Sequence, residues 1–231
     1  MKYHSLNYNS NNVTFLDAVR KGLAPDRGLY FPEKIPKLSE KLIQNINSYS
    51  DHEIAFEVMH PFVGNEISKN KLREIIADTL IFDFPILPIN DKIATLELFH
   101  GPTLAFKDVG ARFMARCLKY ANEIKLNKSL TILVATSGDT GGAVADGFYK
   151  VEGINVVILY PKGKVSAIQE KQLTTLGENI TALEVDGTFD DCQDMVKSAF
   201  IDSDLINEIE LTSANSINIA RWLSQMFYYF I

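Results

Sequence analysis

The chain has 231 residues, of which 46% are hydrophobic and 23% charged, a balance typical of a soluble protein that buries a core. Its net charge of −6 and pI of about 5.3 argue against a protein that binds a nucleic-acid backbone, and no apolar run is long enough to span a membrane. The polar N-terminus, the two separated cysteines (Cys117 and Cys192) and the scattered histidines predict a cytoplasmic protein with buried free thiols and no metal cluster.

Helical patterns dominate the first part of the chain. The first helix should span Thr14 to Lys21 and stop at Gly22, and a turn and a short extended segment ending at Pro32 should follow. Further helices are expected over residues 38–45, 51–59 and 68–82. Pro85 and Pro88 then mark a joint in the chain.

Beyond that joint, apolar strand patterns alternate with helical patterns. Expected strands cover residues 93–98, 130–135, 155–159 and 180–185, and expected helices cover residues 106–120, 142–149, 165–176 and 189–200. The alternation predicts an α/β fold with a parallel sheet that is covered on both faces. We therefore expect a mostly helical N-terminal region over residues 1–90 and a parallel α/β sheet domain over residues 91–231.

The last expected helix, over residues 216–231, has an apolar side and ends without a glycine, a proline or a basic last turn. An apolar end of this kind normally packs against something. One interpretation is a C-terminal helix docked on its own domain. The interpretation that we favour is a chain cut short, whose apolar end at Phe227–Ile231 would allow self-association.

A lysine is the first candidate for chemistry. In the segment ELFHGPTLAFKD, residues 97–108, a strand ends, a Gly-Pro turn reverses the chain, and a helix begins with Lys107 in its first turn. The helix dipole disfavours a cation at that end, and the neighbouring Phe106 is apolar, so that a nucleophilic amine is favoured there. An ordinary surface lysine is the alternative.

The second candidate is the turn ATSGDTGGA, residues 135–143, which joins an apolar strand to a helix. Small residues at a helix N-terminus expose backbone N–H groups that can bind a carboxylate or a phosphate. The glycine spacing matches neither the Walker pattern nor the dinucleotide fingerprint, which weakens a nucleotide interpretation. A tight turn with glycines for close packing would explain the same pattern.

Five segments, in the same order, resemble signatures of the threonine synthases, which are fold-type II pyridoxal-phosphate enzymes. They are GLAPDRGLYFP (22–32), ELFHGPTLAFKD (97–108), ATSGDTGGA (135–143), LYPKGKVS (159–166) and SANSIN (213–218). The resemblance covers essentially the whole chain. It implies the N-terminal portion of such an enzyme, with a fold of the tryptophan-synthase-β kind.

The resemblance also implies an activity: a lyase that converts O-phospho-L-homoserine and water to L-threonine and phosphate, the final step of threonine biosynthesis. Lys107 would bind pyridoxal 5′-phosphate covalently and, once released, would move protons at the substrate carbons Cα and Cβ. The turn would bind the substrate carboxylate, and three later residues would bind its phosphate; the residues implied are Ser137, Gly138, Asp139 and Thr140, then Lys164, Ser166 and Asn215. Lys164 could equally be a solvated lysine.

One part of the family pattern is absent. Members of the family continue further and carry there the loop that binds the cofactor phosphate, and nothing in this chain matches that loop. We therefore expect poor cofactor affinity, and the activity of the chain alone is open. The alternatives are a phospholyase for another phosphorylated amino alcohol, a non-catalytic fragment that binds other chains, and an anion or nucleotide binder that uses residues 137–142.

Overall fold

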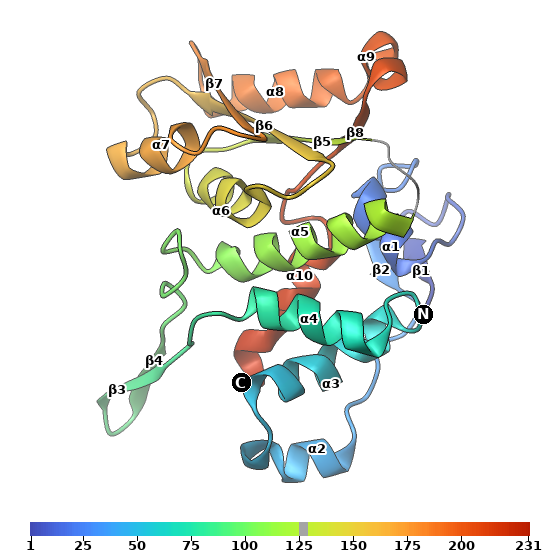
Figure 1. Cartoon of the computed structure of the whole chain (residues 1–231), viewed down its shortest axis with the longest axis vertical. Helices are drawn as coiled ribbons and strands as arrows, with labels where there is room; N and C mark the ends of the chain where they lie inside the picture. The colour runs from blue at the N-terminus through green and yellow to red at the C-terminus, as the bar shows by residue number, and fades with distance from the viewer. Residues whose placement is uncertain (125–128) are drawn as a thin grey trace.

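Helices lie on both faces of a four-stranded parallel sheet in the computed structural model, which describes residues 1–124 and 129–231 (Figure 1). The sheet has the order β7–β6–β5–β8, and its strands are β5 (Leu130–Ala135), β6 (Ile154–Pro161), β7 (Ile180–Val185) and β8 (Glu210–Thr212). The helices around it are α5 (Lys107–Ile124), α6 (Asp139–Phe148), α7 (Ala167–Thr174), α8 (Phe189–Ala199) and α9 (Ser203–Glu208). Because α8 covers one face while α5 and α6 lie on the other, the predicted α/β fold is confirmed. Within the described residues, no helix combines the length and the apolar composition needed to cross a membrane.

The inner strand β5 shows why the sheet is covered on both sides. Its side chains Ile132 and Val134 belong to the main core, together with residues of α5 and α6. Leu133, between them, points to the opposite face and packs in a smaller core with Cys192 and Val196 of α8. Successive residues of a strand face opposite sides, so a strand that is apolar throughout needs a helix on each side.

Short elements build the N-terminal region. They are β1 (Tyr3–Ser5), α1 (Phe15–Lys21), β2 (Tyr30–Pro32), α2 (Glu40–Gln44), η1 (Ile46–Ser48), α3 (Asp51–Val63) and α4 (Lys69–Thr79). The predicted limits of α1 are confirmed, since the Thr14 hydroxyl caps its start and Gly22 ends it with a φ of 71°. The limits of two other helices differ, because α3 continues through Pro61 and α4 stops before residue 80. The pairing of β1 with β2 was not predicted.

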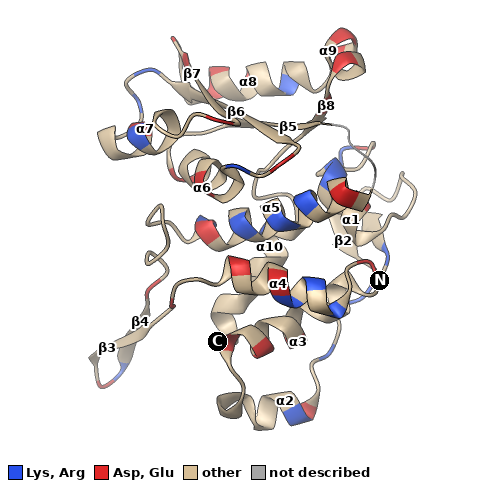
Figure 2. Cartoon of the chain, in the orientation of Figure 1, with Lys and Arg blue, Asp and Glu red and all other residues tan. Residues whose placement is uncertain are grey.

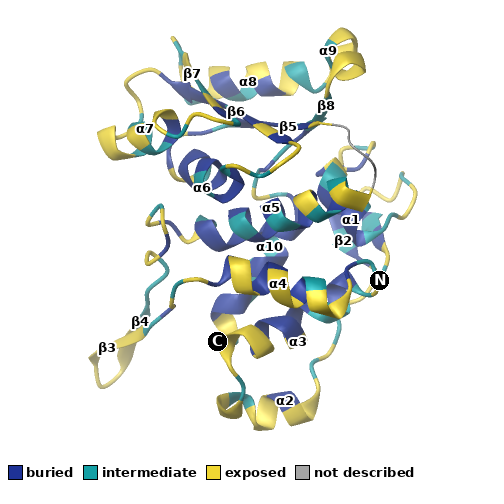
Figure 3. Ribbon diagram, viewed as in Figure 1, coloured by how far each residue is buried: buried dark blue, intermediate teal, exposed yellow. Residues whose placement is uncertain are grey.

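The strand expected at residues 93–98 lies outside the parallel sheet, contrary to the prediction. Instead β4 (Ile93–Leu96) pairs antiparallel with β3 (Ile86–Asn90), a strand that the prolines at the joint had concealed. A two-stranded ladder leaves one side of each strand unpaired, so it tolerates the missing N–H of Pro88. The hairpin projects from the body and is mostly exposed (Figures 1 and 3).

The helix expected at residues 216–231 is broken. Two elements replace it, α10 (Ile219–Ser224) and a 3₁₀ turn, η2 (Gln225–Tyr229). Asn218 caps α10 by accepting a hydrogen bond from a backbone N–H at 3.0 Å. The 3₁₀ turn changes which side chains face inward, so Phe227 and Tyr228 are buried whereas Met226 is half-buried. This end of the chain packs on α3 and α5.

Partly buried polar contacts tie the N-terminal region to the sheet and its helices. Arg20 of α1 donates two hydrogen bonds to Glu210 of β8, at 2.5 and 2.6 Å, and one to Asn122 of α5, at 2.5 Å. Basic residues occur along α5 (Figure 2). One residue of this helix, Arg112, pairs with Asp146 of α6 at 3.3 Å. Arg112 therefore holds two helices together.

The two cysteines are expected to resist thiol reagents in the folded protein. Both thiols are free and buried, as predicted, and burial raises the pKa of each, so the reactive thiolate is disfavoured. Labelling with an aromatic disulfide should be about 10³-fold or more slower without denaturant than in concentrated urea, because it requires opening of the fold. Rapid labelling of Cys192 alone would show that α8 opens independently of the main core.

Candidate functional site

Lys107 is the first residue of α5 and directly follows the turn formed by residues 101–106. Its Nζ lies 3.4 Å from Oδ2 of Asp139, the first residue of α6, and 4.8 Å from the centre of the Phe106 ring. The Lys107 side chain is 21% exposed, so its amine is accessible to solvent while two neighbours limit its position. The structure therefore brings together one predicted residue from each of the two candidate segments.

The turn that precedes α6 is built on a buried hydroxyl that the sequence analysis missed. Oγ1 of Thr136, a residue only 1% exposed, accepts hydrogen bonds from the N–H groups of Gly138 at 3.0 Å and Gly141 at 2.8 Å. Gly138 has a φ of 144°, which favours glycine. Two N–H groups of the turn are thus already bonded, and Ser137 and Asp139 are its exposed residues.

A glutamine also belongs to this arrangement. Nε2 of Gln169 donates to Oδ1 of Asp139 at 2.8 Å, and Oε1 of Gln169 accepts from the backbone N–H and the hydroxyl of Ser166, at 3.2 and 3.0 Å. The result is a chain of contacts from Lys107 through Asp139 and Gln169 to the start of α7. The spacing of Ser166 and Gln169 matches a capping box, a signal that could have identified the glutamine from the sequence.

The remaining predicted residues lie in loops at the carboxyl edge of the sheet. The turn at 136–138 follows β5, Lys164 and Ser166 follow β6, and Asn215 follows β8; parallel strands present these ends at one edge (Figure 1). Lys164 is exposed, Asn215 is half-buried, and the hydroxyl of Ser166 is engaged in the helix cap. No hydrogen bond or ion pair joins Lys164 or Asn215 to Lys107 in the part of the chain that the structure describes.

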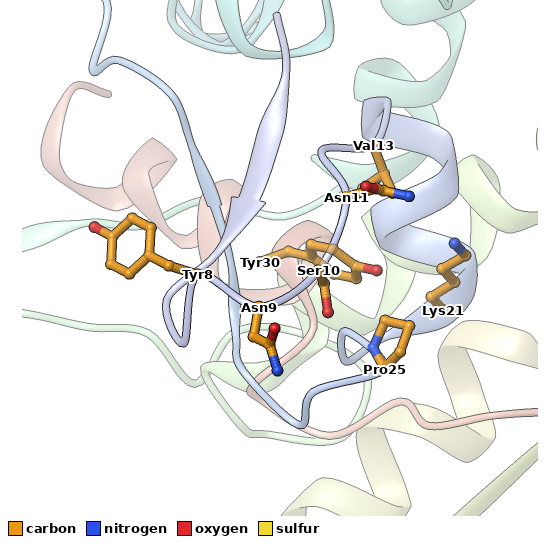
Figure 4. Close-up of a pocket in the computed structure, with 8 residues that line it drawn as sticks. All are labelled: Tyr8, Asn9, Ser10, Asn11, Val13, Lys21, Pro25 and Tyr30. Atoms are coloured by element: carbon orange, nitrogen blue, oxygen red, sulfur yellow. The ribbon is translucent and has the colours of Figure 1, made fainter.

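A polar hollow of about 540 Å³ lies in the N-terminal region (Figure 4). It is lined by Tyr8, Asn9, Ser10, Asn11, Val13, Lys21, Pro25 and Tyr30, and by none of the predicted site residues. The buried Tyr30 hydroxyl has no hydrogen-bond partner among the described residues. Burial and the negative charges of Asp26 and Asp17 raise the pKa of Tyr30. The hollow is therefore not the site that the motifs predicted.

A smaller depression adjoins the two candidate segments. It has a volume of about 360 Å³ and lies between the turn that precedes Lys107 and the helices α6 and α7. Thr103, Gly142 and Gln172 are among its lining residues, and Nε2 of Gln172 donates to the Thr103 carbonyl at 3.3 Å. The turn at residues 101–106, α6 and α7 thus enclose one concave surface, which is not lined by Lys107 or Asp139.

Comparisons with known proteins identify the family of the chain. Residues 2–80 match the family model of the threonine synthase N terminus, and residues 83–227 match that of pyridoxal-phosphate dependent enzymes. Threonine synthases from Buchnera aphidicola (subspecies Baizongia pistaciae) and Escherichia coli are 47% and 45% identical to this chain over 231 and 230 residues. Each match covers 100% of the chain, but 54% and 53% of the relative.

Two crystal structures are similar over the whole chain. The pyridoxal-phosphate-bound threonine synthase from Brucella melitensis superposes with a TM-score of 0.93 at 38% identity, and the match covers 100% of this chain and 51% of that one. Threonine synthase from Escherichia coli gives a TM-score of 0.90 at 44% identity, with coverages of 100% and 53%. The chain therefore spans about half the length of the relatives it matches. It belongs to the pyridoxal-phosphate dependent enzyme family, and the resemblance to threonine synthases inferred from its five segments is confirmed.

Proposed function

We propose that this chain carries the cofactor lysine and part of the substrate site of a threonine synthase, which converts O-phospho-L-homoserine and water to L-threonine and phosphate. The observation that carries the proposal is the position of Lys107. Its amine is partly exposed at the start of α5 and contacts Asp139 of the predicted substrate turn, in a chain that matches threonine synthases over its whole length.

The residues around Lys107 fit covalent attachment of pyridoxal phosphate. A primary amine that is accessible, but whose position is restricted by Phe106 and Asp139, can bond to the cofactor aldehyde. When bound, the cofactor supplies an electron sink that stabilises negative charge on a substrate carbon. Lys107 would take up and return protons at Cα and Cβ, and its contact with Asp139 would hold the amine in place. None of the described residues is assigned to the cofactor phosphate.

The substrate residues divide by charge. A carboxylate on Asp139 repels the substrate carboxylate, so we assign Asp139 to Lys107 and assign the substrate carboxylate to the exposed Ser137, to Thr140 and to unbonded N–H groups at the start of α6. For the substrate phosphate, the exposed ammonium of Lys164 and the amide of Asn215 are better placed than Ser166, whose hydroxyl already bonds Gln169. A carboxylate held beside α6 and a phosphate held by these later loops would direct the reacting carbons toward Lys107.

Cofactor attachment and turnover are tested separately. The protein is mixed with pyridoxal phosphate, reduced with borohydride and digested, and the modified lysines are identified by mass spectrometry. We expect one predominant label, on Lys107, that disappears in Lys107→Ala and persists in Lys119→Ala, a control at an exposed position of the same helix. Labels spread evenly over surface lysines would reject the proposed role of Lys107.

Turnover is measured as phosphate released from O-phospho-L-homoserine, with O-phospho-L-threonine as the competitor. Preference for the second substrate would favour a related phospholyase. Labelling of Lys107 without turnover would support a binding role for this chain, since it spans about half the length of its relatives.

Two further expectations stay predictions. A cytoplasmic location is one, and self-association through Phe227–Ile231 is the other. In that segment Tyr229 is 78% exposed, so it is the side chain that a second copy could contact most readily. Sedimentation of Tyr229→Ser beside the unchanged protein would show whether this end contributes to association.

A further inference from the structure

The residues on each side of Lys107 are bonded to buried groups from elsewhere in the fold. The carbonyl of Phe106 accepts a hydrogen bond from the hydroxyl of Tyr228, a residue of η2 that is only 4% exposed. The fully buried carboxylate of Asp108 accepts hydrogen bonds from the hydroxyl of Thr103 and from the backbone N–H of Thr103, the latter at 2.9 Å. Neither contact involves the Lys107 side chain, yet together they fix the backbone from which it projects.

The contact at Asp108 shapes the turn before Lys107. Leu104, in the middle of this turn, has a φ of 59°, which is uncommon for a residue with a side chain, and its side chain is exposed. Packing of Leu104 therefore does not hold this conformation. The bonds between Asp108 and Thr103 close the turn over the helix start, and they hold the strained backbone in place.

The contact at Tyr228 joins Phe106, the residue before Lys107, to the end of the chain, 122 residues away in the sequence. The Tyr228 ring packs against Phe84, with ring centres 5.1 Å apart, and its neighbour Phe227 packs against Phe113 of α5 at 6.0 Å. These apolar contacts hold η2 independently of the hydroxyl. Loss of the hydroxyl alone should therefore release Phe106 without removing η2 from the core.

A buried arginine completes the cluster. Arg221 of α10 is fully buried and donates to the carbonyl of Ala214, in the loop that carries Asn215. Burial lowers the pKa of Arg221 to about 10, while Tyr228 and Asp108 favour its charged form. Burial also raises the pKa of Asp108. Burial of charged groups costs free energy, so this cluster is weak evidence for stability. It does, however, connect the turn at residues 101–106, η2 and the loop after β8.

We propose that Tyr228 and Asp108 are positioning residues, which hold Lys107 so that its amine faces Asp139. The proposal rests on the function proposed for Lys107. The Phe106 carbonyl lies one residue before Lys107 and the Asp108 carboxylate one residue after it, and both groups are hydrogen-bonded. Together they restrict the position of the Lys107 Cα, so the 3.4 Å contact between Lys107 and Asp139 depends on both.

The experiment compares the reactivity of Lys107 with that of Lys119 in the same molecules. Wild type, Tyr228→Phe and the control Tyr229→Phe are labelled with pyridoxal phosphate and borohydride, and the ratio of label at the two lysines is measured. We expect this ratio to fall about tenfold in Tyr228→Phe and to be unchanged in Tyr229→Phe, whose ring is exposed. An unchanged ratio in a folded Tyr228→Phe protein would overturn the proposal.

A second readout separates positioning from general loosening. Asp139→Asn should alter the labelling of Lys107 in the wild-type background. It should have little effect in the Tyr228→Phe background, because the contact between Lys107 and Asp139 is already lost there. Equal effects in both backgrounds would contradict the proposal. Should Tyr228→Phe fail to fold, Thr103→Ala, which removes one donor to Asp108, gives the same comparison from the other side of Lys107.

Acetic anhydride, which needs no cofactor site, distinguishes failure of this proposal from failure of the proposed function. Suppose that pyridoxal phosphate shows no preference for Lys107, while Tyr228→Phe still alters acetylation of Lys107 relative to Lys119. The function proposed for Lys107 is then rejected, and the positioning role of Tyr228 is supported. If pyridoxal phosphate labels Lys107 selectively in wild type and in Tyr228→Phe alike, the function stands and the positioning fails.

Discussion

Replacement of Thr136 by valine is expected to destabilise the folded chain by about 2–4 kcal/mol. Valine keeps the shape of the side chain but removes the oxygen that accepts the N–H groups of Gly138, at 3.0 Å, and Gly141, at 2.8 Å. A buried donor left without a partner costs about 1–3 kcal/mol, and two buried N–H donors lose their acceptor here. The change in the free energy of unfolding is measured by urea denaturation, monitored by circular dichroism.

The control for this experiment is Thr131→Val in β5, the strand that precedes Thr136; Thr131 is half-buried, and the change should be within about 0.5 kcal/mol. Labelling of Lys107 by pyridoxal phosphate should also fall in Thr136→Val, since the turn positions Asp139. Equal stability of the two variants would mean that water satisfies the turn, and that Thr136 does not determine its conformation.

The parts of the fold that could be predicted are those with a strong local signal. The limits of β5 and β7 agree with the structure to the residue, because each is a short segment rich in apolar and β-branched residues with polar residues on both sides. Segments without such a signal were missed: β8 has three residues, and β3 contains a proline. The partner of β4 was wrong because a strand pattern does not specify which strand lies beside it, a choice made by tertiary contacts.

The candidate site shows the same division. Lys107 and the turn at residues 137–140 stand out because short motifs identify them, and the fold brings Lys107 and Asp139 into contact. Thr136 and Tyr228 were missed because a threonine and a tyrosine are ordinary residues in a strand end and an apolar helix. Their roles depend on buried hydrogen bonds, one of which spans 122 residues of sequence. Such contacts become visible only when helix packing is known.

Replacement of Gly110 by alanine should destabilise the chain by about 1–3 kcal/mol, although alanine is the better helix former. Gly110 lies in α5 at its contact with α10, where an added Cβ would lie 2.9 Å from the backbone oxygen of Arg221 and 3.0 Å from Nε of that residue. The gain in helix propensity is at most about 1 kcal/mol, whereas overpacking against a buried backbone costs about 1–3 kcal/mol and can exceed that. The clash should therefore outweigh the gain.

The matched control is Gly142→Ala in α6. An added Cβ there meets mainly the end of the flexible Gln172 side chain, at 2.8 Å. Rotation of Gln172 gives up its bond to the Thr103 carbonyl, which offsets the gain in helix propensity, so the stability should change by less than about 1 kcal/mol. Because α10 continues into η2, displacement of α10 by Gly110→Ala should also weaken the bond from Tyr228 to Phe106 and lower the labelling of Lys107 relative to Lys119. A stabilised Gly110→Ala protein would show instead that α10 can move away from α5 at little cost, and that Lys107 is positioned without it.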